Sequence, residues 1–166
     1  ATLREIGETR AESFYRGDLA AKIADYIGGH GGFLTRADLA GYKPEWVRPI
    51  SARYRDCEVW EIPPNGQGLV ALMALNMLDG FPAGDKESVL THHRQFEAIK
   101  LAFADGEAYI ADAAHMRTSA AGLLSRKYAD ERRSLITDEA ALPGPGTPPS
   151  GGTVYLAAAD GEGNLV

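Results

Sequence analysis

The chain has 166 residues, of which 45% are hydrophobic, and this proportion indicates a folded domain rather than a disordered segment. Its 17 Lys and Arg face 23 Asp and Glu, and the net charge of −6 argues against a broad nucleic-acid or anionic-membrane surface, which needs clustered cations. No apolar run approaches the roughly 20 residues that span a bilayer, nothing in residues 1–10 resembles a signal peptide, and the single cysteine excludes an internal disulfide.

The first 40 residues have helical patterns. Residues 2–10 have a helical composition, and a second helix is predicted over 18–27, where Leu19, Ile23 and Ile27 recur every four residues. Thr35 followed by Asp38 is typical of a helix N-cap with an acidic residue in the first turn.

The period then changes to that of strands. Residues 47–50 and 57–62 are predicted to be two strands joined by a polar turn at Arg55-Asp56. Cys57 lies in the second strand between two acidic residues, which raise rather than lower a thiol pKa. We therefore expect it to be a packing residue and not a reactive one.

Two longer helices follow the Pro63-Pro64 break. Residues 69–78 are apolar almost all round, which predicts a buried helix. Asp85 is expected to cap the next helix, over 86–111, and a shorter helix is expected near 123–135. The helices at 18–27, 68–79 and 86–111 should pack together, burying these residues: Leu19, Ile23, Leu72, Leu75, Phe96 and Phe103.

The sequence PGPGTPPSGG at 143–152 cannot form a helix or an interior strand, and it is the clearest boundary in the chain. We expect a mainly helical region at 1–142, a linker at 143–152, and at 153–166 a strand and turn that stop in mid-hairpin. The fold class is therefore mainly α with a small β content (α+β). The tail after Pro143 should be poorly held, with self-association through its apolar strand as a possible outcome.

Most candidate functional sites have a simpler structural explanation. The four histidines are not spaced as metal ligands, so no metal site is expected. Residues 65–68 open a helix and could hold an anion, but a tight turn is the better explanation, since the Lys followed by Ser or Thr of a phosphate loop is missing. Asp105 and Asp112 lie seven apart and could form a glycosidase pair, although carboxylates on a helix surface are usually only solvated.

The Gly152-Thr153 step offers more specific chemistry. A hydroxyl residue follows a flexible linker and begins an apolar strand. If the peptide bond before Thr153 breaks, the residue gains a free α-amine, whose reference pKa of roughly 7.7–8.0 allows it to act as a base for its own hydroxyl. Gly152 suits this cleavage because it has no Cβ to block attack on its carbonyl.

Several ordered motifs extend the argument to nearly the whole chain. They are Phe14-Tyr-Arg-Gly17, Gly31-Gly-Phe-Leu-Thr35, Asp38-Leu-Ala40, Tyr42, Pro49-Ile50, Tyr54-Arg55, Pro63-Pro64, Gly66, Gly68, Phe103-Ala-Asp105 and Tyr109 to Asp112. Together they resemble the gamma-glutamyltransferase (gamma-glutamyltranspeptidase) family, including its cephalosporin-acylase-like members.

This resemblance implies a precursor that cuts itself before a threonine. Thr153, Asp160 and Gly163-Asn164 stand where that family has its threonine, its Asp and its Gly-Asn turn. The resemblance therefore implies cleavage between Gly152 and Thr153, with Thr153 as the nucleophile and its freed α-amine as the base. It also implies the αββα sandwich of N-terminal-nucleophile hydrolases, a gamma-glutamyl or related acyl amide as the small-molecule partner, and no cofactor.

The chain departs from the family pattern at three places. Gly152 precedes the threonine where the better-known members often have an acidic or polar residue. Val154 and Tyr155 follow the threonine where the transpeptidases usually have Thr or Ser and then His, and Gly106 replaces the arginine of the Ala-Asp-Arg motif. These departures favour a divergent, acylase-like branch over a glutathione enzyme. The alternative is a non-catalytic helical structural or interaction domain, and we expect the 166 residues alone to be inactive and uncleaved.

Overall fold

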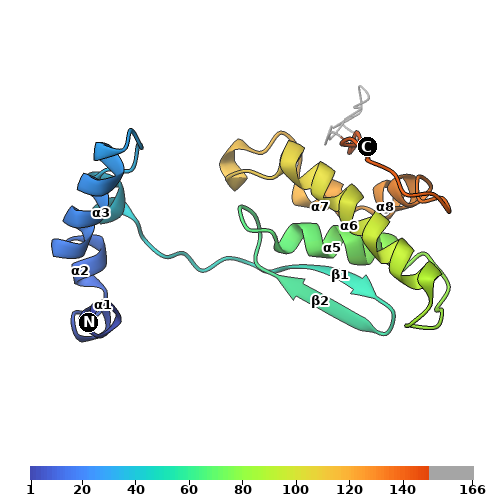
Figure 1. The fold of residues 1–166 in the computed structure, drawn as a ribbon, viewed down its shortest axis with the longest axis horizontal. Helices are drawn as coiled ribbons and strands as arrows, with labels where there is room; N and C mark the ends of the chain where they lie inside the picture. The colour runs from blue at the N-terminus through green and yellow to red at the C-terminus, as the bar shows by residue number, and fades with distance from the viewer. Residues whose placement is uncertain (150–166) are drawn as a thin grey trace, which may run out of the picture. The chain divides into compact units, whose positions relative to one another are not determined.

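The structure, a computed structural model, describes residues 1–149, and the chain divides into two compact units at Trp46 and Val47. Because the placement of the two units relative to each other is not determined, each is described by itself (Figure 1). None of the helices in the described part of the chain combines the length and the apolar composition needed to cross a bilayer.

The first unit consists of four helices. They are α1 (Thr2–Glu8), α2 (Glu12–Tyr15), α3 (Asp18–Gly29) and α4 (Arg36–Gly41). The predicted cap at Thr35 is confirmed: its side chain accepts from the Asp38 amide, and the Asp38 carboxylate accepts from the Thr35 amide at 2.8 Å.

Helix α3 packs against α2 and α4 through a face of small residues. Ala20 and Ala24 are its buried residues, whereas Leu19 and Ile23 are only half-buried, so the prediction of two buried aliphatic residues here is wrong. Small side chains let neighbouring helices approach closely, and the larger residues then lie at the edges of the contact.

The second unit is built around helix α5. Its elements are β1 (Ile50–Tyr54), β2 (Cys57–Glu61), α5 (Gly68–Leu78), α6 (Val89–Tyr109), a 3-10 turn η1 (Ala113–His115), α7 (Ala120–Leu123) and α8 (Arg126–Arg133). Helix α5 contacts the antiparallel β1–β2 hairpin, α6 and α8 (Figure 1). Leu69, Leu72 and Met77 in it are almost completely buried, which confirms the expected central helix.

The hairpin begins later than predicted. The first strand runs from Ile50 to Tyr54 instead of 47–50, because the two-residue turn at Arg55-Asp56 pairs Tyr54 directly with Cys57. Arg55 adopts a φ of 56°, and its amide donates to the Asp79 carboxylate at 2.7 Å. Cys57 therefore lies beside an exposed turn and is itself exposed, so the expectation of a packed cysteine is wrong.

Helix α6 begins at Val89 with Ser88 as its cap, and Asp85 instead accepts from the Glu87 amide in the preceding turn. At Gly106 this helix lies so close to α5 that an added Cβ would be 2.8 Å from Cγ2 of Val70. The predicted face of α6 is wrong, because Phe96 is 66% and Phe103 41% exposed. A different face, which contains two carboxylates, is buried.

Candidate functional site

Gly152 and Thr153, the predicted cleavage site and nucleophile, lie outside the described residues. The structure describes the chain that leads to them as far as Pro149. Residues 141–149 form no helix or strand, as expected. However, the expectation that everything after Pro143 is poorly held is wrong for residues 143–149. Hydrogen bonds with side chains of α6 and α8 hold these residues. We call residues 141–149 the linker run.

The linker run is bonded along one stripe of α6. Glu97, Leu101, Asp105 and Tyr109 are spaced four residues apart and therefore share a helix face. The distance along the helix from the first to the last is about 18 Å at 1.5 Å per residue. Five extended steps along the chain, from residue 141 to residue 146, span about the same length. The linker run thus follows α6 from its first half toward its C-terminal end.

The centre of this stripe is a buried ion pair. Asp105 is 1% exposed and Arg132, on α8, is 5% exposed, and their Oδ2 and Nε atoms lie 3.0 Å apart. Each partner also bonds to the linker run: the Gly146 amide donates to Asp105 at 2.7 Å, and Arg132 donates to the Gly144 carbonyl at 2.8 Å. The pair therefore joins two helices and the linker run at one point.

Two tyrosines complete the surroundings of Gly146. We call the four side chains around it, Asp105, Tyr109, Tyr128 and Arg132, the Gly146 seat. The Tyr109 hydroxyl donates to the Gly146 carbonyl at 2.5 Å, so both polar groups of this glycine are bonded. A Cβ at residue 146 would collide with the Tyr128 hydroxyl and lie 2.8 Å from Cδ of Arg132. Burial, and secondly the Asp105 carboxylate, raise the pKa of Tyr128, which keeps its hydroxyl protonated. The seat accepts a glycine and excludes a side chain.

A second charged pair holds the start of the linker run. Glu97, 4% exposed, forms an ion pair with Lys100 at 2.5 Å and accepts from the Ala141 amide at 3.3 Å. The Lys100 ammonium also donates to the Ala141 carbonyl. The hydrogen bond from Lys100, followed by that from Ala141, lowers the pKa of Glu97 despite its burial.

The end of the linker run lies beside a hollow in the second unit. The Pro149 carbonyl and the side-chain oxygens of Ser119 and Thr118 lie 3.1, 3.3 and 3.4 Å from the position that a Cβ on Gly122 would occupy. The Thr118 hydroxyl is buried and has no hydrogen-bond partner among residues 1–149.

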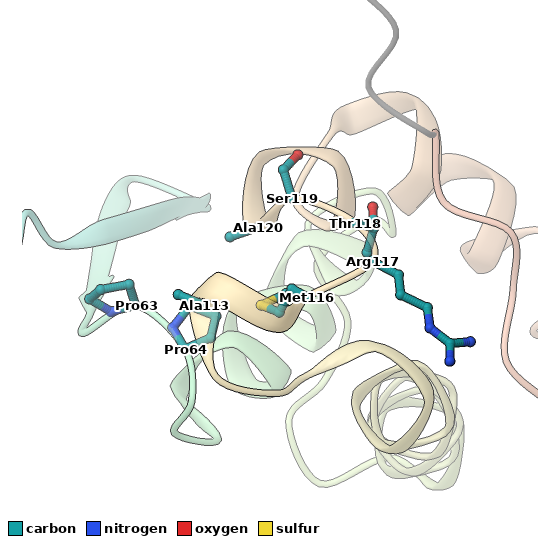
Figure 2. A pocket seen from close by; sticks show the side chains of 8 residues that line it. All are labelled: Pro63, Pro64, Ala113, Met116, Arg117, Thr118, Ser119 and Ala120. Atoms are coloured by element: carbon teal, nitrogen blue, oxygen red, sulfur yellow. The ribbon is translucent and has the colours of Figure 1, made fainter.

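The hollow itself has a volume of about 490 Å³ (Figure 2). The residues that line it are Pro63, Pro64, Ala113, Met116, Arg117, Thr118, Ser119 and Ala120. In Figure 2 the two proline rings lie on one side of it and the Arg117 guanidinium on the other. A chain that leaves Pro149 therefore starts next to a concave surface with hydroxyl groups and one cation.

The other candidate sites do not assemble. Asp105 is buried in its ion pair, whereas Asp112 is exposed and caps η1 by accepting from the Ala114 amide at 3.0 Å, so the two do not form a catalytic pair. At residues 65–68 a Cβ on Gly68 would lie 2.5 Å from a Glu61 carboxylate oxygen, which favours a tight turn over an anion site. Residues 1–149 contain no group of three or more His, Cys, Asp or Glu side chains placed to bind a metal ion.

Sequence reasoning overlooked Arg132, Tyr109 and Glu97 as residues that hold the linker. The signal available was the four-residue spacing of Glu97, Asp105 and Tyr109, which places two carboxylates and a phenol on one helix face. Their partners lie far along the chain, and local periodicity cannot identify them.

Comparison with known proteins gives consistent results. The chain matches the gamma-glutamyltranspeptidase family over residues 1–166. It is 33% identical to the glutathione hydrolase-like YwrD proenzyme of Bacillus subtilis, covering 99% of this chain and 32% of that protein. It is 36% identical to the acylase ACY 1 proenzyme of Pseudomonas sp. strain SE83, covering all of this chain and 31% of that protein. The chain thus spans about a third of the length of the curated relatives it matches.

Solved structures agree with this result. The cephalosporin acylase from Bacillus halodurans is similar with a TM-score of 0.77 and 56% identity, over 99% of this chain and 30% of that one. The gamma-glutamyltranspeptidase of Helicobacter pylori is similar with a TM-score of 0.68 and 26% identity, over 84% of this chain and 41% of that one. The expected α+β part of an N-terminal-nucleophile hydrolase fold is thereby confirmed. The chain belongs to the gamma-glutamyltranspeptidase family.

Proposed function

We propose that the protein carrying this chain cuts itself between Gly152 and Thr153 and then transfers or hydrolyses acyl amides through an acyl-enzyme on Thr153. The observation that carries the proposal is that the family match continues without interruption through residue 166 and so includes this step. Relatives that are 33% and 36% identical are named proenzymes, which supports a maturation step in this protein too.

The chemistry of both steps uses the same oxygen. In the first, the Thr153 hydroxyl attacks the Gly152 carbonyl, the C–N bond breaks, and the acyl group moves to oxygen while the amine is freed. Water then hydrolyses that ester, leaving a Gly152 carboxylate and an N-terminal Thr153. In turnover, the freed α-amine takes the hydroxyl proton as the oxygen attacks the substrate amide, and the leaving amine receives a proton. Water or an amino acid then accepts the acyl group.

The proposed substrates are gamma-glutamyl or related acyl amides. Among the similar proteins, those named glutathione hydrolases and those named acylases both occur, and the similarity at 56% identity is to a cephalosporin acylase. Val154 and Tyr155 after the threonine agree with an acylase-like branch. A glutaryl amide is therefore expected to react faster than a gamma-glutamyl amide.

The test is made in the full-length protein, with Thr153→Ala and Thr153→Ser. Alanine removes the attacking oxygen, so it should abolish both cleavage and turnover, whereas serine keeps an oxygen in place and should retain part of each. The assays are N-terminal sequencing for a fragment beginning Thr-Val-Tyr-Leu, and hydrolysis of a glutaryl anilide and a gamma-glutamyl anilide. Activity that survives in pure Thr153→Ala would show that another residue is the nucleophile.

For the isolated 166-residue chain we propose no activity and no cleavage, because it spans about a third of the length of its relatives. Intact-mass measurement checks this directly. A single species of the full mass is expected, and two fragments that separate at Gly152-Thr153 would contradict the proposal.

A further inference from the structure

We infer that Tyr109, Asp105 and Arg132 are positioning residues for the self-cleavage step: they seat the backbone at Gly144 and Gly146 and thereby restrict where the Gly152 carbonyl can lie. The inference rests on the proposed function and adds to it a set of residues on α6 and α8 that bond to the linker run within the described part of the chain. The contacts that carry it are three hydrogen bonds with the linker backbone, in which Tyr109 and Arg132 donate to carbonyl groups and Asp105 accepts from the Gly146 amide.

The seat lies close to the scissile bond along the chain. Gly152 follows Gly146 by six residues and Pro149 by three. Pro148 is buried, and the Pro149 carbonyl lies against Gly122, so the chain is held beyond Gly146 as well. Three extended residues reach at most about 11 Å. The tether from the held Pro149 to the scissile bond is therefore short, and holding Pro149 limits the space that this bond can sample.

Such confinement matters because self-cleavage is an intramolecular attack. The hydroxyl oxygen and the carbonyl carbon must come within about 3.5 Å of each other in a defined orientation, and conformational freedom lowers the fraction of time that they do. Anchoring one side of the scissile bond removes part of that freedom before the reaction begins.

The bonding pattern favours positioning over simple stabilisation of the helices. A pair that only joined α6 to α8 would need no contact with the linker run, yet Asp105 and Arg132 each bond to its backbone. The Tyr109 hydroxyl bonds to Gly146 and to no other group among the described residues. Removing that hydroxyl therefore changes the hold on the linker without disturbing the contact between the helices.

The first experiment compares Tyr109→Phe with Tyr54→Phe in the full-length precursor. The Tyr54 hydroxyl has no hydrogen bond among the described residues, so its loss is a matched control. The first-order rate constant of cleavage is followed by intact mass after purification of uncut precursor. Tyr109→Phe is expected to slow cleavage about 3- to 10-fold, the effect of one lost hydrogen bond, and Tyr54→Phe should cleave at the wild-type rate.

The second experiment adds a methyl group to the linker. Gly146→Ala places a Cβ against the Tyr128 hydroxyl and Arg132, whereas Gly144→Ala places one where nothing lies within 4 Å. Gly146→Ala should slow cleavage about 10-fold or more, and Gly144→Ala should have little effect. Adding Tyr128→Phe to Gly146→Ala removes the oxygen that the methyl group meets and should restore part of the rate.

The outcomes separate the two proposals. A wild-type precursor that is not cut at Gly152-Thr153, or that is still cut after Thr153→Ala, defeats the proposed function and the positioning role together. A wild type that is cut, with Tyr109→Phe and Gly146→Ala cut equally fast, defeats the positioning role alone. Equal slowing by Gly146→Ala and Gly144→Ala, with no rescue by Tyr128→Phe, would also overturn it.

Discussion

The face of α6 that carries Glu97, Leu101 and Asp105 is buried, whereas the face that carries Phe96, Ile99 and Phe103 lies open. Glu97 and Asp105 are 4% and 1% exposed, and Phe96 is 66% exposed. Ile99 and Phe103 line an apolar groove of about 510 Å³ between α6 and α5. Two carboxylates are thus buried on this helix beside Leu101 and its small apolar neighbours, while two phenylalanines remain exposed to water.

The difference shows that charged side chains of α6 can be buried when they have partners, and that aromatic side chains can stay exposed when they have none. Each buried carboxylate has a cation within 3.0 Å and a backbone amide to accept from, which offsets the cost of removing it from water. Arg132 comes from α8, Lys100 from α6 itself, and the backbone amides from the linker run, so α8 and the linker run cover most of the charged face. The aromatic face receives no such cover from residues 47–149.

The largest expected effect comes from breaking the central ion pair. Asp105→Ala leaves Arg132 buried without a counter-charge, which should lower the free energy of unfolding of the 166-residue chain by about 3–5 kcal/mol. Urea denaturation followed by far-UV circular dichroism measures it. A loss below about 1 kcal/mol would show that water reaches Arg132 and that the charged face is not truly interior.

Replacing both members of the Asp105–Arg132 pair separates the cost of an unpaired buried charge from the cost of the lost hydrogen bonds. Asp105→Leu combined with Arg132→Met leaves no unpaired charge, so it should cost less than half as much as Asp105→Ala alone, in the same denaturation experiment. The bonds to Gly144 and Gly146 are still lost, so some cost remains. A double variant that is as unstable as the single one would mean that the hydrogen bonds to the linker, and not the unpaired charge, dominate.

A pH series tests the second buried carboxylate. The pKa of Glu97 is lowered in the folded state by Lys100 and the Ala141 amide. Its stabilisation is therefore fully present above the unfolded-state pKa of about 4.3, and is lost as the pH falls through the lower folded value.

Glu97→Gln should accordingly lower the free energy of unfolding by about 1–2 kcal/mol at pH 7. The loss should become progressively smaller as the pH falls toward 3. Glu107→Gln, at an exposed position of the same helix, is the matched control. Its difference in unfolding free energy from wild type should not change with pH. Urea midpoints at pH 7, 5 and 3 give the comparison. A Glu97→Gln penalty that is independent of pH would contradict a role for its charge.

The smallest effect is expected on the aromatic face. Phe96→Ser should change the unfolding free energy of the 166-residue chain by less than about 1 kcal/mol, because most of the side chain is already in water. Leu101→Ala, on the buried face of the same helix, should cost about 2–5 kcal/mol. If Phe96→Ser proves as costly as Leu101→Ala, the aromatic face is covered in solution.

Sequence patterns predicted the local features of the fold well. The capping pair Thr35 and Asp38, the turn at Arg55-Asp56 and the all-apolar helix α5 depend on neighbours within a few residues, and these predictions are confirmed. The buried face of α6 was predicted wrongly because Arg132 lies 27 residues beyond Asp105, and no local period reveals a pairing of that kind. Gly146 lies 41 residues beyond Asp105, so its hydrogen bonds were likewise not visible in the local sequence, where the Gly and Pro residues indicated only a flexible linker.

The contact between Gly106 and Val70 has a consequence for how this branch of the family can change. Gly106 stands where the family motif has an arginine, and a single Cβ there would already be 2.8 Å from a Val70 methyl group. A larger residue at position 106 would have to displace the Val70 methyl group or the helix that carries it, whereas a smaller residue at position 70 would relieve the contact. The two positions are thus coupled, and an ancestral reconstruction that treats them as independent characters would overlook a steric constraint between α5 and α6.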